Sequence, residues 1–167
     1  MELSHWEGVK ILNLLKIKKG FTLIELLLVV AILSILLVVV FAALNPGQRL
    51  EDTRDARRWN DVNQILTAIH ECVIDNDLAA CGLGTTVALS QIGTCGSGGA
   101  ALCPGAAAVC LNLDGNLELD SYMAGFPVDP LPSASAATTG YAVQVANGIV
   151  TVSGCLYEGT TAVSVSR

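Results

Sequence analysis

Three residues near the N-terminus, Gly20, Phe21 and Glu25, have types and spacing that could carry chemistry. Glu25 is the only formal charge in the apolar run of residues 21–44, and Gly20 is the small residue directly before that run. Cleavage after Gly20 would leave a free α-amino group on Phe21. A buried carboxylate is best compensated by a cation, so the Phe21 amine of a neighbouring copy could pair with Glu25. Alternatively, Glu25 caps the N-terminus of its own helix, where a negative charge is also favoured.

The apolar run itself, residues 21–44, is long enough to cross a membrane as a helix. At a rise of 1.5 Å per residue it extends about 36 Å, against a hydrocarbon core of about 30 Å. A secretory signal has a shorter apolar core that is closely followed by a small-residue cleavage site, and this sequence has neither feature. A plain single-span anchor explains neither the Gly20–Phe21 junction nor the acid in the run, because a carboxylate inside a bilayer is costly.

The segment 18–33 resembles the class III signal peptide and N-terminal helix of type IV pilins and type II secretion pseudopilins. The resemblance implies that a dedicated prepilin peptidase cleaves between Gly20 and Phe21 and methylates the new N-terminal Phe21. It also implies that Glu25 is the assembly glutamate of a helical filament whose core holds the apolar helices. A weaker similarity continues through residues 54–69 and returns at residues 126–130 and at Gly140-Tyr141.

The charge distribution argues against direct binding of nucleic acid. Residues 21–167 hold 5 basic and 13 acidic side chains, so 5 − 13 gives a formal charge of −8. After Arg58 no Lys or Arg occurs until Arg167. Binding to phosphate backbones requires a basic stripe, which such a head lacks. The basic residues that follow the apolar run form one patch close to the membrane: Arg49, Arg54, Arg57 and Arg58.

Six cysteines lie beyond the apolar run, and none forms a C-x-x-C pair of the kind that zinc ribbons use. An even number of cysteines in a small, loop-rich head predicts disulfides and an oxidising compartment, although free buried thiols are the alternative. Four Lys precede the run and four Arg follow it, so the positive-inside rule alone gives a tie. The cysteines favour a head outside the cytoplasm, with the connectivity left open: Cys72, Cys81, Cys95, Cys103, Cys110 and Cys155.

Beyond the membrane, Asn45-Pro46-Gly47 predicts a break in the helix, because proline removes a backbone donor. Apolar residues then recur at three- and four-residue spacing to about residue 77, which predicts an amphipathic helix that packs on a sheet. The early part of this helix mixes acids with the arginines, either as a solvated face or as charges that pair between neighbouring subunits. The predicted stripe is Trp59, Val62, Leu66, Ile69 and Val73, and the acids are Glu51, Asp52 and Asp55.

Residues 78–113 carry no charge and are rich in Gly and Ala, which predicts a long disulfide-tied loop with no regular element at residues 96–99. The lack of charge fits a surface covered by a neighbouring subunit. Two hairpins are predicted next, at residues 108–119 around Asp114-Gly115 and at residues 141–152 around Asn147-Gly148, because both dipeptides favour type I′ turns. A last strand is predicted at residues 161–165.

Other residues that could do chemistry are few. Asp114, Asn116, Glu118 and Asp120 alternate as oxygen ligands of calcium could, or they form a solvated acidic strand face. The spacing is not that of an EF-hand. His70 is the only histidine in residues 21–167, so a nucleophilic triad and enzymatic activity are not expected. No cofactor other than calcium is expected.

Together these features predict an α+β protein in which a long N-terminal helix carries a small antiparallel-sheet head. The predicted organisation is a leader at 1–20, a membrane and assembly helix at 21–44, its amphipathic continuation at 45–77 and a disulfide-tied head at 78–167. The predicted function is a subunit of a type IV pilus-like filament. Its partners would be further copies, the prepilin peptidase, inner-membrane assembly machinery and membrane lipid. The alternatives are a type II secretion pseudopilin, a minor pilin for adhesion or DNA uptake, and a membrane-anchored binding module.

Overall fold

The computed structural model describes residues 20–167, which fall into two compact units that divide between Asn45 and Pro46. Each unit is described by itself. Most of the predicted leader lies outside the described residues.

The first unit is the apolar helix α1 (Leu23–Leu44), whose side chains are all exposed. Its 22 residues extend about 33 Å. Within residues 20–167 this is the part of the chain that is long and apolar enough to cross a membrane. The helix ends at Asn45, which has φ of 40°, in the left-handed region that terminates helices. The break predicted from Asn45-Pro46 is therefore present.

The second unit is built on helix α2 (Pro46–Asp75), which begins with proline in the first helical position, where its missing N–H costs nothing. One face of α2 is buried against the sheet, as the predicted stripe requires. Trp59 departs from the prediction, because 37% of its surface is exposed. The buried face consists of Arg58, Val62, Ile65, Leu66, Ala68, Ile69 and Cys72.

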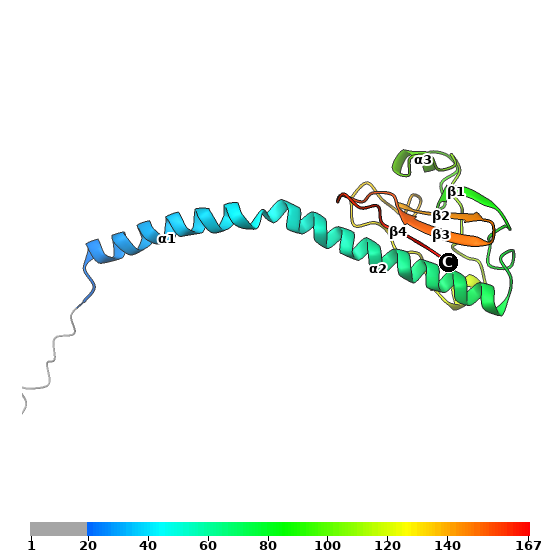
Figure 1. Cartoon of the computed structure of the whole chain (residues 1–167), viewed down its shortest axis with the longest axis horizontal. Helices are drawn as coiled ribbons and strands as arrows, with labels where there is room; N and C mark the ends of the chain where they lie inside the picture. The colour runs from blue at the N-terminus through cyan, green and yellow to red at the C-terminus, as the bar shows by residue number, and fades with distance from the viewer. Residues whose placement is uncertain (1–19) are drawn as a thin grey trace, which may run out of the picture. The chain divides into compact units, whose positions relative to one another are not determined.

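A four-stranded antiparallel sheet packs on α2, which confirms the predicted α+β fold. Its strands follow chain order: β1 (Val87–Gln91), β2 (Tyr141–Ala146), β3 (Ile149–Gly154) and β4 (Ser164–Ser166). Helix α2 runs along β3 and β4, and the short helix α3 (Gly99–Leu102) lies beside β1 (Figure 1). The core between α2 and the sheet is formed by aliphatic side chains such as Ile65, Ile69, Val143 and Val152.

The hairpin predicted around Asn147-Gly148 is confirmed. Asn147 and Gly148 have φ of 54° and 77°, as a type I′ turn requires, and Ala146 pairs with Ile149 directly across it. The last strand also exists, but β4 begins and ends later than the predicted residues 161–165.

The prediction of a second hairpin at residues 108–119 is wrong. Asp114 does not have the positive φ that a type I′ turn requires, although Gly115 does, at 79°. The Asn116 side chain instead accepts hydrogen bonds from the backbone N–H groups of Glu118 and Leu119, both at 3.1 Å. These bonds start the short 3₁₀ helix η1 (Leu119–Ser121), so the returning strand never forms.

The uncharged segment 78–113 is not one long loop, because it contains β1 and α3. Strand β1 has no alternating pattern: its Ser90 and Gln91 are both buried, and its pairing with β2 shifts register between Val87 and Ser90. Helix α3 begins at Gly99, inside the glycine run that was predicted to exclude regular structure.

All six cysteines are paired, so the alternative of free thiols is wrong. Cys72–Cys81 ties the end of α2 to the following turn, and Cys95–Cys110 closes the loop that contains α3. Cys103–Cys155 joins α3 to the segment after β3 across 52 positions of sequence.

The loop that each disulfide closes predicts how much it stabilises the head. Replacing both Cys103 and Cys155 by Ser should lower the free energy of unfolding by about 4 kcal/mol, because a long loop is released. Replacing both Cys72 and Cys81, which are 9 positions apart, should cost only about 2.5 kcal/mol. Urea unfolding of the full chain in detergent measures both losses, and an equal or reversed order would contradict the loop argument.

Candidate assembly site

The predicted processing site lies in non-helical backbone. Gly20, Phe21 and Thr22 precede the first turn of α1, and 88% of the surface of Phe21 is exposed. A peptidase must bind an extended segment around the bond it cuts, so the Gly20–Phe21 bond has the accessibility that cleavage needs.

Glu25 is engaged with its own helix terminus. The Thr22 backbone N–H donates to Glu25 Oε2 at 2.9 Å, and the Thr22 hydroxyl donates to the same oxygen at 2.8 Å. In return the Glu25 N–H donates to Thr22 Oγ1 at 3.3 Å, which completes a reciprocal capping box. The single chain thus adopts the local alternative that the sequence left open. Pairing of Glu25 with a neighbour's amine stays a prediction.

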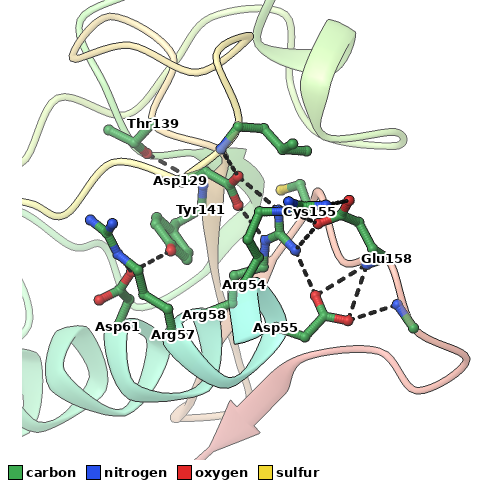
Figure 2. A network of polar contacts seen from close by, with 12 residues as sticks. Arg54, Asp55, Arg57, Arg58, Asp61, Asp129, Thr139, Tyr141, Cys155 and Glu158 are labelled. Atoms are coloured by element: carbon green, nitrogen blue, oxygen red, sulfur yellow. Dashed lines mark hydrogen bonds and ion pairs between the residues drawn. The ribbon is translucent and has the colours of Figure 1, made fainter. Parts of the chain in front are cut away.

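A second polar site lies in the head, where Arg58 of α2 is completely buried (Figure 2). Its Nε donates to Asp129 Oδ2 at 2.6 Å and one terminal nitrogen donates to Asp129 Oδ1 at 2.9 Å. The other terminal nitrogen donates to Asp55 at 2.6 Å and to Glu158 at 3.0 Å. Three carboxylates from three separate segments therefore converge on one guanidinium.

Arg54, one turn earlier on α2, extends this network. It forms a two-bond pair with Glu158, with distances of 2.6 and 2.5 Å. Asp55 accepts from the backbone N–H groups of Glu158 and Gly159, the latter at 2.7 Å. Side chains and backbone of the segment after β3 are thus fixed to residues 54–58 of α2.

The Asp129 loop is fixed from the sheet side as well. Asp129 N–H donates to the Thr139 carbonyl at 2.9 Å, and the Thr139 hydroxyl donates to the Ile92 carbonyl at 2.6 Å. Gly140, with φ of 82°, lies so close that an added Cβ would be 2.8 Å from the Asp129 Cβ. The Tyr141 hydroxyl donates to Asp61 at 2.6 Å. Residues 126–130 and Gly140-Tyr141, which carry the weaker family resemblance, therefore meet around Arg58.

The network shifts the pKa values of Glu158, Asp55 and Arg58 toward their charged forms. Hydrogen bonds from Arg54 and then Arg58 lower the pKa of Glu158 to about 2. Burial alone would raise the pKa of Asp55, but hydrogen bonds from Arg58 and from two backbone N–H groups lower it below its usual value. Burial would lower the pKa of Arg58, yet its hydrogen bonds to Asp129, Asp55 and Glu158 raise it. All these groups are charged at neutral pH.

This cluster on α2 is not a solvated face, because Arg54, Asp55 and Arg58 pair within the chain with one another, with Asp129 and with Glu158. Pairing of the other α2 acids, Glu51 and Asp52, with a neighbouring subunit stays a prediction. A signal was available in the sequence. Arg58 precedes Val62 by four positions and so lies on the apolar stripe, where a charge needs a buried partner.

The calcium candidates do not share a strand face, because the strand they were placed on does not form. The Asn116 side chain is already used, accepting from two backbone N–H groups and donating to the Ala80 carbonyl at 3.0 Å. Among residues 20–167 no group of three or more His, Cys, Asp or Glu side chains is placed to hold a metal ion. Calcium binding at Asp114, Glu118 and Asp120 stays a prediction. His70 is half-buried, and its Nε2 has no hydrogen-bond partner within the described chain.

The buried Arg58–Asp129 pair predicts that replacing Arg58 costs far more stability than replacing its neighbour Arg57. Arg58→Met leaves the Asp129 carboxylate buried without a cation, so it should lower the free energy of unfolding by about 3–5 kcal/mol. Arg57→Met removes a side chain that is 58% exposed and reaches Asp61 only at 3.7 Å, so it should cost less than about 1 kcal/mol. Thermal and urea unfolding test the contrast, and similar losses for the two variants would contradict it.

The lowered pKa of Glu158 predicts a pH dependence. The unfolded chain has an ordinary glutamate pKa near 4.5, so the stability that ionised Glu158 contributes is complete above that pH and is lost as the pH falls toward about 2. Glu158→Gln should therefore lower the melting temperature at pH 5–7, and the gap to the wild-type chain should narrow between pH 4.5 and 2. A gap that stays constant down to pH 2 would show that ionisation of Glu158 contributes nothing.

A comparison with protein families finds one match: residues 15–41 match the prokaryotic N-terminal methylation motif. Comparisons with curated proteins and with solved structures find no match. The matched residues include the Gly20–Phe21 junction, Glu25 and most of α1. The matched segment is the class III signal-peptide motif of type IV pilins and pseudopilins, and it is followed by a head of α+β fold.

Proposed function

We propose that this protein is a structural subunit of a type IV pilus-like filament, assembled after cleavage between Gly20 and Phe21. The observation that carries the proposal is the methylation motif over residues 15–41, with its single acid in an otherwise apolar helix. The prepilin peptidase and inner-membrane assembly machinery are the expected partners. Membrane lipid surrounds α1 before assembly.

The three disulfides support a head that lies outside the cytoplasm, since disulfides persist in oxidising compartments. The α1 side chains support burial in a filament, because all of them are exposed in the single chain. Moving α1 from lipid into a filament core exchanges one apolar surrounding for another. The gain must then come from close packing and from polar contacts such as that of Glu25.

In this proposal the capping box holds Glu25 until a neighbour arrives. Cleavage creates a positive amine on Phe21, and the Glu25 carboxylate of an adjacent subunit is the one anionic group along the apolar run that can pair with it. Such a pair fixes the axial register between copies, because each helix has one acid and one terminal amine.

Two conservative substitutions separate the cap from the ion pair. Glu25→Gln keeps a side chain that completes a capping box but removes the charge, so fibre yield should fall at least tenfold. Thr22→Val removes the capping hydroxyl and keeps the charge, so fibres should form at close to the wild-type level. Sheared surface fibres are counted by electron microscopy, and membrane levels of both chains are checked by immunoblot.

Wild-type fibre yield from Glu25→Gln would contradict the pairing role. A loss with Thr22→Val as severe as with Glu25→Gln would assign the importance of Glu25 to helix capping instead.

A further inference from the structure

The charges of the head are confined to part of its surface. Residues 46–167 hold 5 basic and 12 acidic side chains, so 5 − 12 gives a formal charge of −7. The cations and acids lie on α2, at Asp77, at residues 114–120, in the buried network and at the C-terminal Arg167. Residues 78–113 and 130–157 contain no Lys, Arg, Asp or Glu. Contact through the uncharged part avoids placing the acids of two heads directly against each other.

One face of the sheet belongs to this uncharged part. Val150 and Val152 are buried toward α2, so the alternating Ile149, Thr151 and Ser153 lie on the opposite face. The register places further polar side chains beside them, because residues paired across strands share a face. We call this the outward face; its other members are Ala142, which is fully buried, and Gln144, Ala146, Ser164 and Ser166.

A groove of about 470 Å³ opens where the outward face meets the segments after α3 and β3. Its lining is uncharged and includes Leu89, Pro104, Ser153, Tyr157, Ala162 and Ser164. The volume is several times that of a leucine side chain, so a branched aliphatic group from another molecule fits inside it.

The wall of this groove is held rigidly. Cys155 is bonded to Cys103, and Glu158 is fixed by Arg54 and Arg58. Tyr157 lies between these two fixed points and still has 44% of its surface exposed. A large aromatic side chain held in place and left exposed is the kind of residue that anchors protein interfaces.

We propose that this groove receives the Ile149 side chain of a second copy of the chain, an inference that rests on the proposed filament function. Ile149 is 52% exposed at the far end of β3, five residues from Gly154, or about 17 Å along the strand. Since the groove and Ile149 lie at opposite ends of the same face, the contact is head-to-tail and leaves a free groove and a free Ile149 at the ends. Head-to-tail contacts produce open filaments when successive copies do not close into a ring.

The first test places a charge in the groove. Ser153→Lys should reduce fibre number at least tenfold, because the lysine would be buried against an uncharged partner surface, whereas Ser153→Thr should assemble normally. Ser164→Lys, on the paired strand, gives a second variant if the first fails to accumulate. Ser121→Lys on η1 is the control for added charge and should leave fibre number unchanged. Wild-type fibre number from both groove variants, or an equal loss with Ser121→Lys, would overturn the proposal.

The second test identifies the occupant. A photo-crosslinking benzoylphenylalanine at position 157 in the full chain should, on irradiation of whole cells, yield dimers of this chain. Mass spectrometry should map the joined peptide to residues around Ile149. Crosslinks to a different protein, to another part of the chain or to nothing would overturn the proposal.

The two proposals fail separately. Normal wild-type fibres without a crosslink from position 157 remove the groove contact and leave filament function standing. If this chain is absent from the surface fibres of wild-type cells, the proposed filament function is wrong. The proposed groove contact, which rests on that function, is then wrong as well.

Discussion

The head depends on one constraint, the burial of the Arg58 guanidinium between α2 and the sheet. A charge in that position is tolerated only when it is paired and hydrogen-bonded, and Asp129, Asp55 and Glu158 accept four hydrogen bonds from it. The register of α2 on the sheet, the course of the Asp129 loop and the position of the segment after β3 are therefore set together. Hydrophobic packing along the Ile65 and Ile69 face adds stability but does not by itself fix this register.

The same constraint links the interior of the head to its surface. Because Glu158 is held by α2 and Cys155 by a disulfide, Tyr157 is presented at a fixed place beside the groove. The network also uses five charged groups within the chain, so they are not available for contacts between copies. What remains for such contacts is the exposed, mostly acidic remainder of α2 and a broad uncharged surface.

Part of the fold and of the Arg58 network could be predicted from the sequence, and part could not. The Asn147-Gly148 hairpin was predictable because Asn-Gly favours positive φ at both turn positions, and both residues adopt it. The same logic failed at Asp114-Gly115, where the Asn116 side chain starts η1 instead. Strand β1 carries no alternation because two of its adjacent residues are buried. The position of Arg58 on an apolar stripe indicates that it has a buried partner. That this partner is Asp129, 71 positions away, is decided by the tertiary fold.

The central claim is that this chain becomes a filament subunit once its Phe21 amine is released. The most direct measurement is mass spectrometry of the N-terminal peptide of this chain, recovered from sheared surface fibres of wild-type cells. The account predicts a peptide that begins with N-methylated Phe21 and contains an unmodified Glu25. A chain that retains Gly20 and the residues before it in the fibres, or that begins elsewhere in α1, would contradict the account.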